Sequence, residues 1–338
     1  MQHKTFFSFY GIGVLVETEN MEIAAAAKHN FSYFYSATIA GTNIKIYYHE
    51  WSLPYSSLPV MTSTAATPRN ICYKDSDKAY IDYFGKAICV YDVKNNIFDI
   101  YTTDNGLANE IIYTTILSRV AELLDKKGMH RIHALGVEYD NKGALILLPC
   151  GGGKTSLTLS LLTSRDNNIK LISEDSPLIK NGMLFPFPLR IGVRTEENLK
   201  NDIPEKFLRK TRRIEHESKT TIDIEYFSKH ICKNPVPINA ILVGIRSTAD
   251  NAEIKPISKF GVIKHCLMNS VIGVGLYQGM EFIMQNNGKE ILKRFAILFS
   301  RTIANINIIF KAKTFSFIIS RDIPKNSDTL RRFLNKLP

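Results

Sequence analysis

Three glycines followed by a lysine and a threonine stand near the middle of the chain, two residues after an apolar run at 144–148. The candidate ligand-binding residues are Gly151, Gly152, Gly153, Lys154, Thr155 and Ser156. Glycines let backbone N–H groups turn inward around an anion at the start of a helix. The lysine of such a loop reaches the β and γ phosphates, and the hydroxyl that follows it is a ligand for Mg²⁺. The pattern therefore predicts a P-loop (Walker A motif) that binds a nucleoside triphosphate, ATP or GTP, with Mg²⁺. A turn that uses glycine only for tight packing is the alternative.

An acidic pair, Glu174 and Asp175, follows the loop lysine by about twenty residues, a place where phosphoryl transfer can use it. One carboxylate there can contact Mg²⁺ and the other can act as the catalytic base. The spacing favours this chemistry over the alternative, an acidic turn that caps the next element. His133 has a catalytic and a structural interpretation, because a lone histidine is more often structural. Lys154, Glu174, Asp175 and His133 are the catalytic candidates.

The elements that must position these residues follow in a regular series. The sequences GVEY (136–139) and ALILL (144–148) have the character of strands, and the turn 140–143 between them predicts an antiparallel hairpin. The run IKLI (169–172) is expected to be a strand that ends at the acidic pair. P-loop strands usually lie within parallel sheets with helical crossovers, so the hairpin predicts a mixed sheet instead.

Two domains are expected from the order of elements along the 338 residues. Residues 1–108 form an N-terminal α+β domain of short strands and one helix. Residues 109–338 form the nucleotide-binding domain, which opens with a helix that ends at Gly128. The elements expected after the loop are a strand over 238–245, helices near 260–285 and 289–305, and a terminal helix entered through Asn326 and Ser327. The fold class is α/β of mixed α+β character.

The composition indicates a globular protein with an excess of positive charge. The net charge of +11 suits an anionic ligand, and a basic cluster stands at Arg209–Arg213. We interpret that cluster either as a mobile loop that meets the acceptor or nucleotide, or as a solvated surface loop. The five cysteines are scattered without a CxxC pair, which indicates a reducing compartment and no zinc site. No run reaches the length of a membrane span, and the apolar N-terminal stretch lacks a cleavage site, so a cytoplasmic protein without membrane contact is expected.

Five segments together resemble a known superfamily. They are RIHALGV (131–137), DNKG (140–143), LPCGGGKTSL (148–157), LISEDSPLI (171–179) and FPFPLRIGV (185–193). In this order they resemble the HPr serine kinase and phosphoenolpyruvate carboxykinase superfamily, most closely its small HPr-kinase-like proteins, over roughly residues 109–322. The resemblance implies a P-loop core with mixed sheets. The residue roles that it implies are phosphate and Mg²⁺ contacts by Gly151, Gly153, Lys154 and Thr155, metal or base chemistry at Asp175, and His133 near the transferred phosphate.

The chain departs from the pattern of that superfamily at three positions. Leu148 replaces the first loop glycine, Cys150 replaces the loop serine, and Glu174 replaces the first aspartate of the strand end. Because the replaced aspartate would be the base, the division of base and metal ligand between Glu174 and Asp175 stays open.

These features predict an ATP- and Mg²⁺-dependent kinase, a transferase that moves the γ-phosphoryl group to a hydroxyl of a peptide, protein or small-molecule acceptor. HPr itself is a doubtful acceptor, because the glycine-rich signature of HPr kinase/phosphorylase is missing. The alternative, motivated by the three departures, is a catalytically weak nucleotide-binding accessory or regulatory protein. A nucleotide hydrolase is disfavoured, because the sequence offers no evident arginine finger. A nucleic-acid partner rests on net charge alone and is not expected. Assembly into a homo-oligomer stays open.

Overall fold

The structure is a computed structural model that describes residues 1–148, 151–163, 168–193, 203–211, 219–272 and 288–337, with the backbone alone for 288–294. The contacts divide the chain into two compact units. Of the described residues, unit 1 holds those within Met1–Leu123 and Gly192–Asp223. Unit 2 holds those within Leu124–Ile191, Ile224–Tyr277 and Gly288–Pro338. This division differs from the expected boundary at 108/109, because most of one long helix and the 192–223 segment group with the N-terminal residues.

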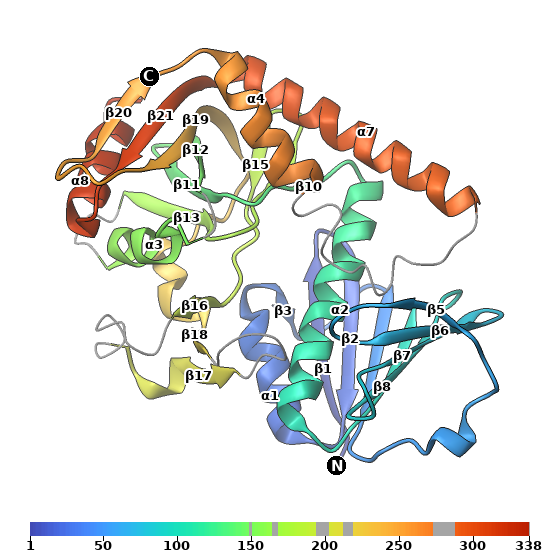
Figure 1. The fold of residues 1–338 in the computed structure, drawn as a ribbon. Helices are drawn as coiled ribbons and strands as arrows, with labels where there is room; N and C mark the ends of the chain where they lie inside the picture. The colour runs from blue at the N-terminus through green and yellow to red at the C-terminus, as the bar shows by residue number, and fades with distance from the viewer. Residues whose placement is uncertain (149–150, 164–167, 194–202, 212–218, 273–287, 338) are drawn as a thin grey trace. The chain divides into compact units, whose positions relative to one another are not determined.

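Unit 1 is built on a sheet whose described strands follow the order β3-β1-β2-β4-β9-β8-β7-β6-β5 (Figure 1). These strands are β1 (His3–Phe9), β2 (Ile12–Thr18), β3 (Tyr35–Ser36), β4 (Ile44–His49), β5 (Ser63–Ala66), β6 (Ile71–Asp75), β7 (Lys78–Asp82), β8 (Ile88–Asp92) and β9 (Ile97–Tyr101). A smaller sheet joins β16 (Ile191–Val193), β18 (Lys219–Ile222) and β17 (Leu208–Thr211). The helices are α1 (Met21–Asn30), most of α2 (Asn105–Lys126), and the short 3₁₀ turns η1 (Ser32–Phe34), η2 (Tyr55–Ser57) and η4 (Glu205–Phe207).

Local sequence explains how α1 and the first hairpin of unit 1 begin. The Asn20 side chain caps α1 by accepting hydrogen bonds from the backbone N–H groups of Glu22 (2.9 Å) and Ile23 (3.1 Å). Tyr10 and Gly11 both have positive φ, as a two-residue turn between twisted antiparallel strands requires. The strands and the helix that form here agree with the short strands and one helix expected for the N-terminal residues.

Unit 2 is built on a mixed sheet in the order β10-β14-β15-β19-β12-β11-β13, and β21 pairs with β19 and β20. The strands are β10 (His130–Arg131), β11 (Leu135–Tyr139), β12 (Lys142–Leu147), β13 (Ile169–Ser173), β14 (Leu178–Lys180), β15 (Met183–Phe185), β19 (Val236–Arg246), β20 (Glu253–Pro256) and β21 (Lys313–Ile319). The helices are α3 (Lys154–Leu162), the 3₁₀ segment η5 (Ile224–His230), α4 (Lys259–Leu267), the π-helical turn η6 (Met268–Ile272), α7 (Gly288–Lys311) and α8 (Ile323–Leu334).

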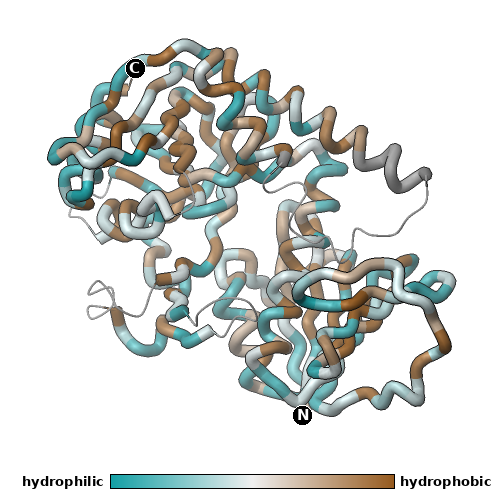
Figure 2. Tube along the Cα trace, in the orientation of Figure 1, coloured by the Kyte–Doolittle hydropathy of each residue, from teal (hydrophilic) through white to brown (hydrophobic). Residues whose placement is uncertain are grey.

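Helices cover the sheet of unit 2 in two groups (Figure 1). α4 and α7 pack against β19 and β21, while α3 packs against β13 and α8. The buried core under α4 and α7 takes alternate residues of β12 and β19 and the inner side chains of both helices: Leu145, Leu147, Ile241, Val243, Val262, Cys266, Ile308 and Ile309. Hydrophobic residues accordingly gather on the central strands of this unit in Figure 2. None of the described helices is both long and apolar enough to cross a membrane.

The strand that leads into the glycine loop has one antiparallel and one parallel neighbour. β12 pairs antiparallel with β11 through a turn in which Asp140 and Asn141 have positive φ, so the expected hairpin is confirmed. On its other side β12 runs parallel to β19. The sheet is therefore mixed, as predicted from the hairpin.

The C-terminal helix begins earlier than the sequence pattern predicted. α8 starts at Ile323, because the Asp322 side chain caps it by accepting a hydrogen bond from the backbone N–H of Lys325 at 3.1 Å. The expected entry through Asn326 and Ser327 is wrong, since both residues lie buried inside the helix. The helix expected near 260–285 consists of α4 and η6 up to Ile272, and its remainder lies outside the described residues.

Candidate functional site

The described part of the glycine loop turns directly into α3. Gly151 and Gly153 have φ values of 69° and 81°, in the left-handed region that favours glycine. A Cβ atom on either glycine would meet no described atom within 4 Å. The alternative interpretation, glycine for tight packing, therefore does not explain these two positions. Gly153 is the N-cap of α3 and supplies no side-chain hydrogen bond, so the first turn has no side-chain cap. Cys150 lies outside the described residues.

Lys154, at the start of α3, meets two of the other candidates. Its Nζ atom lies 2.6 Å from Oδ1 of Asp175 and 2.9 Å from Nε2 of His133. The Nδ1 atom of His133 lies 3.2 Å from the same Asp175 oxygen. With a proton on Nδ1, His133 donates a hydrogen bond to Asp175. Lysine, histidine and aspartate thus contact one another in a triangle.

The charge state of Asp175 follows from this triangle. Burial acts to raise the pKa of Asp175, but the hydrogen bond from His133 and the charge of Lys154 outweigh burial and hold that pKa well below its usual range. The Asp175 side chain is still 42% exposed, so the triangle opens to solvent.

The second acid contacts the next residue of the loop helix. The Thr155 hydroxyl donates a hydrogen bond to Oε1 of Glu174 at 2.7 Å. Burial, and then the neighbouring charge of Asp175, raise the pKa of Glu174 above its ordinary value. The Lys154 ammonium contacts Asp175, and its charge lowers the pKa of Glu174 less than burial raises it.

A serine, not an acid, organises the turn after β13. The Ser173 hydroxyl donates to the backbone carbonyl of Phe187 at 2.7 Å and accepts from the backbone N–H of Ser176 at 3.0 Å. Within the described part of the chain, no backbone N–H hydrogen bonds to the side chain of Glu174 or Asp175. The capping interpretation of the acidic pair thus has no support, because Ser173 satisfies this turn.

The backbone of the His133 segment is fixed from two sides. The N–H of His133 donates to the carbonyl of Asn269 in η6 at 2.9 Å, and the N–H of Ile132 donates to the carbonyl of Pro177 at 3.1 Å. His133 therefore depends on a π-helical turn, an irregularity that is frequent at functional sites.

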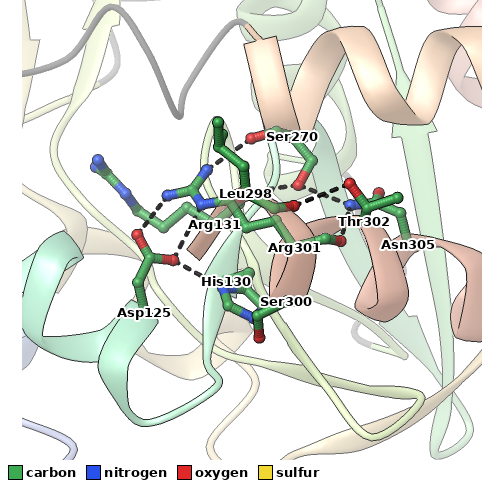
Figure 3. Close-up of polar contacts among 9 residues, drawn as sticks. All are labelled: Asp125, His130, Arg131, Ser270, Leu298, Ser300, Arg301, Thr302 and Asn305. Carbon is green, nitrogen blue, oxygen red and sulfur yellow. Dashed lines mark hydrogen bonds and ion pairs between the residues drawn. The ribbon is translucent and has the colours of Figure 1, made fainter. Parts of the chain in front are cut away.

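A buried polar network contacts the π-helical turn η6 (Figure 3). Asp125 accepts hydrogen bonds from Nη2 (2.7 Å) and Nε (3.1 Å) of Arg301, and it lies 2.8 Å from Nδ1 of His130. Arg301 also donates through Nη1 to the carbonyl of Ser270 in η6 at 2.6 Å, and the Asn305 amide donates to the Ser270 hydroxyl at 2.9 Å. The network thereby ties α7 and the end of α2 to the turn that holds His133.

Sequence reasoning missed this network. Asp125 and Arg301 stand 176 positions apart, so no local spacing connects them. A signal does exist in α7, where Arg301 is the one charged residue of the sequence 295–310 and Asn305 follows it by four residues. Two polar residues on one face of such a helix indicate a buried polar contact.

The basic cluster at Arg209–Arg213 is only partly described, and its described part is not a loop. Arg209 and Lys210 lie in β17, which pairs with β18 in unit 1. The guanidinium of Arg209 contacts the Glu22 carboxylate at 3.2 Å. The expectation of a mobile loop is therefore wrong for these residues, while Arg212 and Arg213 lie outside the described residues.

The structure thus brings together Lys154, Thr155, Glu174, Asp175 and His133 at the start of α3. Among the described residues, no group of three or more histidines, cysteines or acids is placed to hold a metal ion. No protein-family model matches the sequence, and a comparison with curated proteins gives no significant match.

Proposed function

We propose that this protein is an ATP- and Mg²⁺-dependent kinase that transfers the γ-phosphoryl group to a hydroxyl of a peptide, protein or small-molecule acceptor. One observation carries the proposal. Two consecutive residues of the loop helix, Lys154 and Thr155, contact two consecutive acids, Asp175 at 2.6 Å and Glu174 at 2.7 Å. A lysine and a hydroxyl at a helix start, opposite carboxylates at a strand end, are the groups that P-loop phosphotransferases use.

The chemistry of the site fits a nucleotide and a divalent cation. The open glycine turn and the helix start without a side-chain cap suit an anion. The Thr155 hydroxyl and the Glu174 carboxylate are hard oxygen donors, the type that Mg²⁺ prefers. Mg²⁺ in such sites is held by one or two carboxylates together with substrate phosphates and water, not by a cage of protein ligands. A cation beside Glu174 would offset the charge of Asp175, which together with burial raises the pKa of Glu174.

We assign the roles that the sequence left open to the two sides of the site. Thr155 and Glu174 are the residues that would hold Mg²⁺, which supplies charge neutralisation of the phosphates when it is bound. Lys154 would bind the phosphate oxygens. When Lys154 binds phosphate oxygens, Asp175 loses the ion pair that helps to lower its pKa. Asp175 would then orient the acceptor hydroxyl and take its proton, and His133 would hold Asp175 in place.

Transfer of radiolabelled γ-phosphate from ATP tests the proposal. Wild-type protein with Mg²⁺ and a cell lysate should label an acceptor. Lys154→Ala should lower this labelling by about a hundredfold or more, since a phosphate-binding cation is lost. The matched control is Lys170→Ala, at an exposed lysine of β13, which should leave labelling unchanged.

Calorimetric titration with ATP separates the remaining outcomes. Mg²⁺-dependent ATP binding without any transfer would favour the accessory or regulatory function over the kinase. Equal ATP affinity in wild type and Lys154→Ala would contradict the assignment of the loop itself.

A further inference from the structure

Helix α7 has two faces of different character. Arg301, Asn305, Ile308 and Ile309 are buried within unit 2. Among the described side chains of this helix, five large apolar ones are exposed and are here called the α7 stripe: Phe295 (64% exposed), Phe299 (69%), Ile303 (51%), Ile306 (44%) and Phe310 (67%). The largest apolar patch of a typical monomeric protein covers a few hundred Å² and often has a function. The α7 stripe therefore indicates an interaction surface.

The spacing within the α7 stripe is that of a helix–helix seam. Phe299, Ile303, Ile306 and Phe310 are separated by four, three and four residues, the alternation of a and d positions in a heptad. Ala296, three residues before Phe299, continues the register. None of these positions carries a charge. Such a seam packs against a second helix with the same pattern, and a second copy of α7 supplies one.

The size of the α7 stripe matches what a stable dimer needs. A fully exposed phenylalanine presents roughly 200 Å², so the three phenylalanines contribute about 400 Å² and the whole stripe about 550 Å². Two copies packed stripe against stripe would bury about 1,100 Å², which exceeds the roughly 1,000 Å² of a specific interface.

We propose that the α7 stripe is the interface of a homodimer in which two copies of this chain pack α7 against α7 about a two-fold axis. Ile303, at the middle of the stripe, meets its counterpart near the axis. Each copy carries a net charge of +11, so long-range repulsion opposes the association while apolar burial drives it. Added salt should therefore strengthen the dimer, whereas it would weaken binding to an anionic membrane or a nucleic acid. This proposal does not depend on the kinase activity.

Sedimentation equilibrium of the purified full chain tests the dimer. Wild-type protein should sediment as a dimer at micromolar concentration and associate more tightly in higher salt. Phe299→Glu and Ile303→Glu each place like charges across the seam and should raise the dissociation constant by about a hundredfold or more. Val60→Glu makes a matched change at an exposed apolar residue of unit 1 and should leave the constant unchanged. Thermal melting confirms that the variants are folded.

A second measurement locates the contact. The described native cysteines are buried, and Cys150 is replaced by serine in every protein of this test. In that background Ile303→Cys treated with a short bismaleimide should give a covalent dimer, while Val60→Cys and the background protein should not. The proposal is overturned if wild-type protein is monomeric at all concentrations, whether or not that monomer binds anionic vesicles. It is also overturned if the glutamate variants dimerise as tightly as wild type does.

Discussion

Unit 2 contains the same trio of groups twice, an aspartate contacted by a histidine Nδ1 and by a basic side chain. In one trio Asp175 lies 3.2 Å from His133 and 2.6 Å from Lys154. In the other, Asp125 lies 2.8 Å from His130 and 2.7 Å from Arg301. The difference is burial: Asp175 is 42% exposed, whereas Asp125 is 7% exposed. Similar residue types therefore serve different purposes, according to whether solvent and ligand can reach them.

The partners of the two trios agree with this distinction. Arg301 presents a planar fork that grips the buried carboxylate with two nitrogens, and the far nitrogen of His130 meets the Ser300 hydroxyl at 2.9 Å. Lys154 presents a single ammonium on a flexible stem, which can exchange a carboxylate for a phosphate. The buried trio of Asp125, His130 and Arg301, here called the closed trio, is suited to holding structure. The solvent-exposed trio of Asp175, His133 and Lys154, here called the open trio, is suited to chemistry.

Replacing Arg301, the cation of the closed trio, should have the largest effect on stability. Arg301→Met leaves the Asp125 carboxylate buried without its charge partner, which should lower the free energy of unfolding by about 3–5 kcal/mol. Denaturant titration followed by circular dichroism measures the loss. The matched control is Lys255→Met, which breaks an exposed pair with Glu253 and should cost less than about 1 kcal/mol. A similar small loss in both variants would contradict the structural role of the closed trio.

Replacing Asp175 and Glu174 separately by their amides should lower activity and leave stability nearly unchanged. Asp175→Asn should reduce phosphoryl transfer by about a hundredfold or more, because the amide cannot accept the proton of the acceptor hydroxyl. Glu174→Gln should chiefly raise the Mg²⁺ concentration that half-maximal transfer requires. Neither change should alter the free energy of unfolding by more than about 1 kcal/mol. Transfer assays over a series of Mg²⁺ concentrations, together with melting curves, measure both properties. A large loss of stability with unchanged transfer would show that the two acids have a purely structural role.

Exchanging the two histidines for glutamine should give opposite patterns. His130→Gln should cost about 1–3 kcal/mol of stability, because a buried side chain with two polar contacts is replaced. Transfer measured well below the melting temperature should persist. His133→Gln should leave stability within about 0.5 kcal/mol of wild type while transfer falls. If both variants changed the same property, the distinction between the trios would fail.

The pH dependence of stability should show the smallest effect. The pKa of Asp175 is lower in the folded than in the unfolded chain, so its ion pairing stabilises the fold above the unfolded value of about 4 and is lost as pH falls below it. Glu174 has the opposite sign, because its raised pKa favours the protonated form and ionisation costs stability as pH rises. The stability advantage of wild type over Asp175→Asn should therefore shrink on acidification from about pH 6 to pH 3, by less than about 1 kcal/mol given the exposure. Denaturant titrations across this range would show no such trend if Asp175 were unpaired.

The parts of the molecule that follow local rules were predictable from sequence. The β11–β12 hairpin and the strand ending at Ser173 were predicted correctly, because turn residues and apolar runs are local signals. The start of α8 was placed too late, since Asp322 competes with Asn326 and Ser327 as a cap and only burial decides between them. The polar network around Asp125 was not predictable, because its members meet only in the folded chain. β17 was missed for the same reason, since its pairing with β18 is a tertiary contact.

The parallel pairing of β12 with β19 has a consequence for the order of folding. The hairpin partner of β12 lies a few residues away, whereas Ala144 and its parallel partner Ala240 are separated by nearly a hundred residues. The hairpin can close on the microsecond scale, but the parallel contact must await closure of a long loop. During synthesis, the strand that leads into the glycine loop is therefore paired on one side long before β19 emerges from the ribosome. The sheet that carries the start of α3 is accordingly completed late in folding, after the local hairpin has formed.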